Sequence, residues 1–134
     1  MSQHHDALIY TMVIVSAADR EMADAELRRM GQLVTFLPVF GDFNVDDLPM
    51  AAEDCAPLLA DENGLDKILA LITQGIPPKL RETAYAIACD IAAADGKVQL
   101  EEARILEMLR DALKIDSLAA AAIERGARAR HATL

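Results

Sequence analysis

The sequence predicts an all-α protein of about seven helices, in which two related helical hairpins pack in a single compact bundle. Apolar residues make up 53% of the chain, yet aromatic residues make up only 4% and tryptophan is absent. A core of alanine, leucine, isoleucine, valine and methionine favours helices, because strands are enriched in aromatic and β-branched residues. The apolar residues recur at helical spacing, and Gly, Pro and Asn separate the segments. At this length we expect one domain, residues 1–134.

The first predicted hairpin covers residues 5–37. Its two helices, residues 5–18 and 23–37, each carry an apolar stripe at helical spacing, and the second ends before Pro38. The stripes are Leu8, Met12 and Val15 in the first helix, and Leu27, Met30, Val34 and Leu37 in the second.

Two inserted helices are predicted within residues 44–74. Asn44 is placed to cap the first of them, and Pro49 falls in an early turn, where a missing N–H is tolerated. Pro57 is expected to kink or shorten this helix. An Asn-Gly break then precedes the second inserted helix, residues 65–74.

The second predicted hairpin covers residues 79–114 and follows a double-proline stop. Its helices span residues 79–94 and 99–113. The residues expected to be buried are Leu80, Ala84, Ile87 and Ile91 in the first helix, and Ala103, Leu106 and either Leu109 or Leu113 in the second.

The chain ends carry the remaining helix and all the histidines. A seventh helix, capped by Asp116 or Ser117, is predicted to run to about residue 129. The adjacent His4 and His5 are interpreted as a mobile terminal pair rather than a transition-metal site, and His131 is also near a terminus.

Negative charge is concentrated in the first half of the chain. Residues 1–67 hold 13 acidic and 4 basic residues, whereas residues 68–134 hold 9 of each. This balance argues against nucleic-acid binding, because an acidic surface repels phosphates. The face formed by residues 42–66 either keeps the protein solvated or docks a basic protein partner or a membrane-associated complex. Its acids are Asp42, Asp46, Asp47, Glu53, Asp54, Asp61, Glu62 and Asp66.

One pattern occurs twice: AADREMADAE at residues 17–26 returns as AADGKVQLEE at residues 93–102. In both copies a small apolar helix ends at Ala-Ala-Asp, a turn follows, and a second helix carries Glu seven positions after the Asp. Ca²⁺ and similar divalent cations prefer several oxygen ligands, which carboxylates and carbonyls in such a turn supply. The candidate metal ligands are Asp19, Asp24 and Glu26 in the first copy, Asp95, Glu101 and Glu102 in the second, and Asp90 on the preceding helix.

A structural role explains the same residues. Glu102 stands three positions after Gln99, with the apolar Val98 before it, which is a weak capping box with a hydrophobic staple. The two aspartates would then make Asx-type turns. Asp90, a charge on an otherwise apolar helix, is either a functional residue or a salt-bridge partner. The spacing does not match the EF-hand loop, so capping and cation binding both stay open.

Residues 88–102, ACDIAAADGKVQLEE, continuing through Leu109, resemble the second hairpin of the TerB-like tellurite-resistance proteins, and residues 19–26 are similar to the first. The resemblance extends over nearly the whole chain and implies two related helical halves with acidic metal-binding or interaction sites, acting in a tellurite or general stress response. Carried over by position, those acids are Asp19 and Glu26 in one half and Asp95 and Glu102 in the other. Arg20 departs from the second copy, which has Gly96, and would place a positive charge in the first site.

An enzyme is not expected, because the chain has no nucleophile elbow, phosphate-binding glycine loop or zinc signature. Cys55 and Cys89 are interpreted as buried free thiols in a reducing compartment. The apolar run at residues 7–18 is too short to span a bilayer, and no basic stretch precedes it, so we expect no membrane insertion and a cytoplasmic protein.

Overall fold

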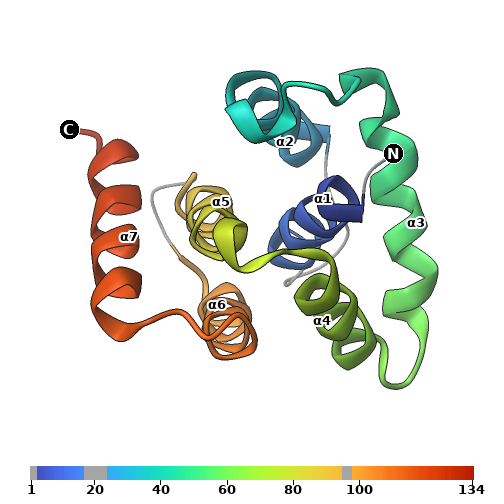
Figure 1. The fold of residues 1–134 in the computed structure, drawn as a ribbon. Helices are drawn as coiled ribbons and strands as arrows, with labels where there is room; N and C mark the ends of the chain where they lie inside the picture. Colours follow the sequence, from blue (N-terminus) through green and yellow to red (C-terminus); the bar gives the residue numbers. More distant parts are fainter. Residues whose placement is uncertain (1–2, 17–23, 95–97) are drawn as a thin grey trace.

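The computed structural model describes residues 3–16, 24–94 and 98–134, apart from the side chain of Asp24 (Figure 1). This part of the chain forms seven α-helices and no strand, which confirms the all-α prediction. The helices are α1 (Gln3–Ser16), α2 (Asp24–Phe36), α3 (Leu48–Ala60), α4 (Gly64–Gly75), α5 (Arg81–Ala93), α6 (Leu100–Ala112) and α7 (Ser117–Arg130). Short 3₁₀ turns, η1 (Pro38–Phe40), η2 (Val45–Asp47) and η3 (Pro78–Leu80), lie between α2 and α3 and before α5.

Helices α1 and α5 lie side by side in the middle of the molecule, and the other helices cover them (Figure 1). The pair α3 and α4 packs on α1, whereas α7 packs on α5 at the opposite side of the molecule. Helix α6 contacts both middle helices, and α2 contacts α5. The buried apolar side chains of these helices form one continuous cluster, and α1 and α5 lie at its centre.

The central position of α1 follows from its side chains. Leu8, Met12 and Val15 are fully buried, as the apolar stripe predicted. Ile9 and Ile14, which lie off that stripe, are buried as well. A helix that is apolar on every side is stable only when other elements surround it. Although α1 is strongly apolar, none of the described helices is both long enough and apolar enough to cross a membrane.

The interpretation of the first histidines as a mobile terminal pair is wrong for His5. Its side chain is only 3% exposed, and its Nε2 lies 3.0 Å from the carbonyl oxygen of Val39 and 3.2 Å from Oδ1 of Asp42. The ring also stacks on Phe40 and meets the edge of Phe43. The reason is that α1 begins at Gln3, so its first turn already packs against the connection after α2.

Around the third helix, the roles of Asn44 and Pro57 differ from the predicted ones, whereas the position of Pro49 agrees with its prediction. Asn44 caps η2 rather than α3, since its Oδ1 accepts a hydrogen bond of 3.0 Å from the backbone N–H of Asp46. Pro49 lies in the first turn of α3, as predicted. Pro57 lies inside α3 without ending it, because the helix continues to Ala60. Pro57 is exposed, and the carbonyl that loses its donor is on a side that water can reach.

The buried face of α6 differs from the predicted one. Ala103 is exposed, so its predicted burial is wrong, and Leu106 is only half-buried. Leu109, which was predicted, and Ile105, which was not, form the buried face, because α6 lies against α5 and α1 along this side. Leu113, just after the helix, is also buried.

The cap of α7 is Asp116 rather than Ser117. Its Oδ2 accepts a 3.2 Å hydrogen bond from the N–H of Ala119.

Candidate functional site

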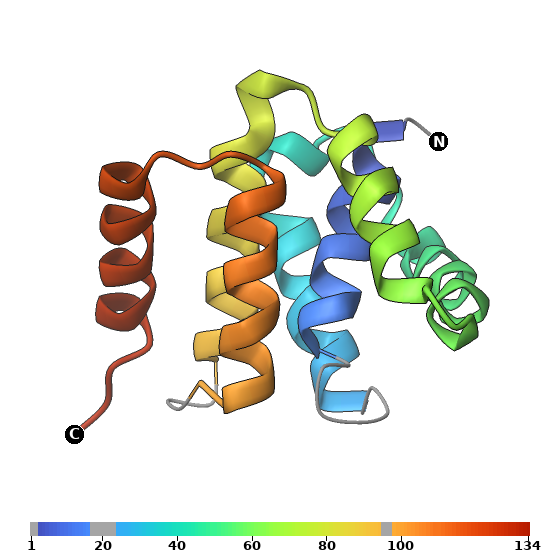
Figure 2. The ribbon, with the colours of Figure 1, turned by 90° about the horizontal axis from the view of Figure 1, so that it is seen from below.

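The two copies of the repeated pattern lie where α1 is followed by α2 and where α5 is followed by α6, and the helix ends beside them can be compared directly. Figure 2 shows that α1 and α5 run in the same direction and finish at the same end of the molecule, where α2 and α6 begin. Helices α1 and α5 are also in contact. Acidic side chains carried by these four helix ends therefore belong to one end of the bundle.

The candidate metal ligands fall partly outside the described residues. Asp19 and Asp95 lie outside them, and so does the side chain of Asp24. Among residues 3–16, 24–94 and 98–134, no group of three or more His, Cys, Asp or Glu side chains is arranged to hold a metal ion. Because the predicted set includes side chains beyond these ranges, cation binding at the turns stays a prediction.

Glu102 performs the capping role that its spacing suggested. Its Oε1 accepts a 2.9 Å hydrogen bond from the backbone N–H of Gln99, immediately before α6. This bond satisfies an amide that has no partner within the helix. The neighbouring Glu101 is exposed, and Glu26, in the first turn of α2, is half-buried. The capping bond uses one carboxylate oxygen of Glu102, so capping does not by itself remove the group as a cation ligand.

Asp90 is a salt-bridge partner that connects α5 to the end of α7. Its Oδ1 accepts hydrogen bonds from Nη2 of Arg130 at 2.6 Å and from Nε at 3.2 Å. Nε2 of His131 lies 3.4 Å from the same oxygen. The Asp90 side chain is 18% exposed, which favours this charge-assisted pair over a solvated carboxylate. A cation at Asp90 would have to compete with Arg130.

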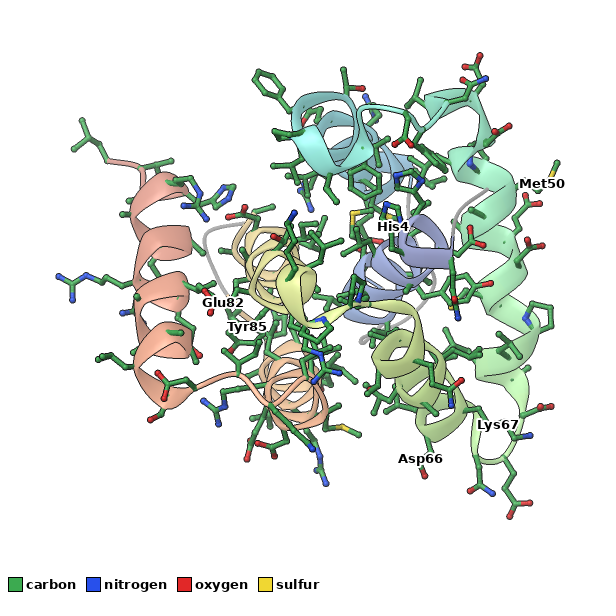
Figure 3. All side chains as sticks on the ribbon, viewed as in Figure 1. His4, Met50, Asp66, Lys67, Glu82 and Tyr85 are labelled. Atoms are coloured by element: carbon green, nitrogen blue, oxygen red, sulfur yellow. The ribbon has the colours of Figure 1, made fainter. Side chains whose placement is uncertain are left out.

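A second polar group, which the sequence did not suggest, lies in a pocket of about 340 Å³ between α5, α6 and α7. The hydroxyl of Tyr85, a residue labelled in Figure 3, donates a 2.6 Å hydrogen bond to Oε2 of Glu124. Burial and this bond raise the pKa of Tyr85 well above its usual range, so the hydroxyl stays a donor. Arg110 lies 3.7 Å from the same oxygen of Glu124. These contacts of Glu124 with Tyr85 and Arg110 hold α7 against α5 and α6. In the sequence, the only indication of this polar group is a tyrosine within an alanine-rich helix.

The acidic residues of the segment 42–66 lie before α3, within it, directly after it and in the first turn of α4. Asp42 contacts His5, and Asp61 pairs with Lys67 at 3.1 Å, near the lower end of α4 in Figure 3. The other acids of this segment have no ion-pair partner among the described residues. The same segment carries exposed apolar surface, because Met50 of α3 is 63% exposed. The segment is therefore an acidic face with apolar residues within it.

Both cysteines are buried free thiols, as predicted. Burial raises the pKa of Cys55 from its ordinary value of 9.0 to about 11, and burial raises the pKa of Cys89 to about 12. A raised pKa keeps the sulfur protonated and unreactive, because the thiolate is the nucleophile.

We expect both thiols to resist a thiol reagent at about pH 8 until the protein unfolds. The folded chain retains protons that the unfolded chain releases above the ordinary thiol pKa, so this contribution to stability is complete at neutral pH and is lost as the pH rises toward 11. Urea unfolding across this range should show a falling free energy, with a shallower slope in Cys55→Ala. Fast labelling of the native protein at about pH 8 would contradict the expectation.

Comparison with known proteins agrees with this architecture. A family model described as Tellurite resistance protein TerB matches residues 5–125, which is nearly the whole chain. No curated protein matches the chain significantly, and neither does any solved structure. The match begins within α1 and ends within α7, so it includes α2 to α6, most of α1 and α7, and both copies of the repeated pattern. The chain therefore belongs to the TerB family of tellurite resistance proteins.

Proposed function

We propose that this chain is a non-catalytic cytoplasmic module that binds a divalent cation, Ca²⁺ or a similar ion, at its repeated acidic turns, and acts in a tellurite or general stress response. The observation that supports it best is the shared direction of α1 and α5 (Figure 2). This arrangement brings the helix ends that carry Glu26 and Glu102 to one end of the bundle. Membership of the TerB family supports the connection with tellurite resistance.

The chemistry of the candidate ligands suits a hard cation. All of them are carboxylates, and Ca²⁺ and Mg²⁺ bind through oxygen atoms. In the second copy Glu101 is exposed, and Glu102 contributes a carboxylate at the start of α6. Asp95 would complete this set, whereas Asp90 would join it only after losing Arg130. Arg20 in the first copy favours the second turn as the stronger site.

The test is thermal unfolding of metal-stripped protein with Ca²⁺, Mg²⁺, Mn²⁺ or Zn²⁺ added separately. An ion that binds only the folded chain stabilises it by about 2.7 kcal/mol at a hundred times its Kd, so Tm should rise for at least one ion. The double variant Asp95→Asn/Glu102→Gln should lose this rise. The glutamine keeps an oxygen acceptor for the N–H of Gln99, so a lost cap does not complicate the comparison.

The matched control is Glu107→Gln/Asp111→Asn, which removes the same charge from exposed residues further along α6. This control should respond to the ion as the wild type does. If no ion raises Tm at millimolar concentration, the proposal is wrong. If the ion raises Tm equally in both double variants, the site lies elsewhere on the acidic surface.

A second candidate is a metal-free adaptor that binds a basic protein partner or a membrane-associated complex through the acidic face of residues 42–66. The observation that favours it is the set of exposed carboxylates around α3 without ion-pair partners among the described residues. Charge complementarity of this kind speeds association and selects the partner. The two candidates use different parts of the chain, so variants can separate them.

A further inference from the structure

A pocket of about 370 Å³ lies over the C-terminal end of α5, between α2 and α7. Both of these helices contact α5, on different sides of it (Figure 1). One face of α2 forms a wall of the pocket with side chains at helical spacing: Arg29, Gln32, Leu33 and Phe36. The other lining residues are Asp90, Ile91 and Ala94 of α5, and Arg130 and His131 at the end of α7. The pocket shares no lining residue with the one beside Tyr85, and its volume suits a small molecule.

The lining of this pocket is basic, although the chain as a whole carries a net charge of −9. It contains two arginines and one acidic residue, Asp90, so one positive charge stays in excess even when His131 is neutral. Apart from Asp90, every polar side chain of the lining can donate a hydrogen bond. A monoanion is therefore attracted, whereas a cation is repelled and a dianion would leave negative charge uncompensated.

The pair with Asp90 does not use all the donors of Arg130. Nε and Nη2 of Arg130 donate to one oxygen, Oδ1 of Asp90, at 3.2 Å and 2.6 Å, so Nη1 takes no part in the pair. The Arg130 side chain is 54% exposed and therefore accessible to a ligand. Arg29 interacts with another group of the protein, but a guanidinium carries five N–H donors. Both arginines can donate to a carboxylate and keep their present contacts, and arginine matches the planar carboxylate geometry.

The apolar side chains of the lining select the rest of the ligand. Ile91 is buried and Leu33 is half-buried, so they offer an apolar surface beside the arginines. Phe36, on the same wall, is 85% exposed, although a phenylalanine gains much from burial. An aromatic or aliphatic group against Leu33 and Phe36 would remove this surface from water. An inorganic anion cannot make these contacts, so an organic anion fits better.

We propose that this pocket binds a small organic monoanion, a carboxylate attached to an aromatic or aliphatic body. The carboxylate lies between Arg29 and Arg130, and the body lies against Leu33 and Phe36. Apart from Asp90, the site shares no residue with the candidate cation ligands or with the acidic face of residues 42–66. It is therefore a third site, which variants can test separately from the two candidate functions.

The test uses naphthoate, a fluorescent aromatic carboxylate, beside its neutral amide, naphthamide. In titrations of the full chain at neutral pH, naphthoate should bind about tenfold more tightly than the amide, because only the carboxylate forms charge-assisted hydrogen bonds. Acetate, which has the charge without the aromatic body, should not displace naphthoate at equal concentration. The proposal is wrong if naphthoate does not bind at millimolar concentration, if both naphthyl probes bind equally, or if acetate competes equally.

Substitutions in the lining should separate the two parts of the ligand. Arg29→Gln and Arg130→Gln should each weaken naphthoate binding about tenfold and leave naphthamide binding unchanged. Phe36→Ser should weaken the binding of both probes, because it removes apolar contact. The matched control is Arg125→Gln, which removes the same charge from an exposed residue of α7 outside the pocket and should change nothing. An equal loss in Arg125→Gln would indicate general charge attraction and overturn the proposal.

Asp90→Asn provides a result that a loss of folding cannot mimic. It removes the one acidic group of the lining and keeps an oxygen acceptor for Arg130, so naphthoate should bind several-fold more tightly. Weaker binding in this variant, at an unchanged Tm, would contradict the proposal. NMR chemical-shift changes on naphthoate addition should fall on Gln32, Ile91 and Ala94. Changes confined to α6 would assign the probe to the pocket beside Tyr85 and overturn the proposal equally.

Discussion

Replacement of Gly64 by alanine is expected to lower the free energy of unfolding by about 3 kcal/mol, which is near the upper end for overpacking substitutions. Gly64 is the first residue of α4 and follows directly on the connection from α3. A Cβ there would overlap the carbonyl oxygen of Leu58 and would stand 2.8 Å from that of Leu59. Both are backbone atoms at the end of α3, so they cannot rotate away. The connection between α3 and α4 would have to shift, and both helices pack on α1.

Gly31→Ala is the matched control, because the same substitution in α2 has room for its Cβ. It should stabilise the protein by about 0.5–1 kcal/mol, the usual difference between glycine and alanine inside a helix. Urea unfolding of the two variants beside the wild type measures both changes. Opposite signs would support local steric overlap at Gly64. A similar loss in both variants would contradict it.

His5→Ala is the other substitution with a large expected effect, a loss of about 2–3 kcal/mol from the free energy of unfolding. The ring is 3% exposed, so its removal leaves a cavity at the start of α1. The carbonyl of Val39 also loses its hydrogen bond with Nε2. The stacking on Phe40, with ring centroids 5.6 Å apart, and the edge contact with Phe43, at 5.3 Å, are lost with the ring.

The neighbouring His4 provides the control, because it is only half-buried. His4→Ala should cost less than about 1 kcal/mol, as substitutions away from the core do. His5→Phe keeps an aromatic ring while removing the hydrogen bond, and its stability should fall between the wild type and His5→Ala. Thermal and urea unfolding would rank the three variants. Equal losses from His4→Ala and His5→Ala would show that the packing of the His5 ring contributes little.

The helices were predictable because their signals are local. The stripe of Leu8, Met12 and Val15 repeats at the period of the helix, and these residues are buried. The capping of α6 by Glu102 depends on groups three residues apart. Asp116 likewise caps α7 through the N–H of Ala119. Each signal involves only neighbours along the chain, so the amino-acid order was enough to suggest it, although the cap of α7 stayed open between Asp116 and Ser117.

Burial was harder to predict, because it depends on what packs against a residue. His5 has the position of a terminal residue but is covered by the connection after α2, more than thirty residues away in the sequence. Ala103 matches the helical period yet faces outward, since the buried side of α6 is centred on Ile105 and Leu109. Helical periodicity identifies an apolar face but does not say which neighbour covers it.

The candidate site likewise combines features that the sequence predicted with contacts that only the packing of the helices produces. The repeated acids were visible in the sequence, and so was the ambiguity between capping and cation binding. Asp90 stood out as a charge on an apolar helix, but its partner Arg130 lies 40 positions later in the chain. The bond from Tyr85 to Glu124 spans 39 positions. Partners so far apart meet only after α7 has packed on α5, so no local pattern reveals them.

The amino-acid order alone was sufficient for the all-α class, the seven described helices and the resemblance to TerB, because these depend on propensity, period and neighbouring residues. Long-range packing was needed for the rest. It places α1 and α5 together in the middle, so that the helix ends beside both turns share one end of the bundle. It also ties Asp90 to Arg130 and leaves Phe36 exposed. These features come from burying apolar surface between distant segments, which is a property of the whole chain.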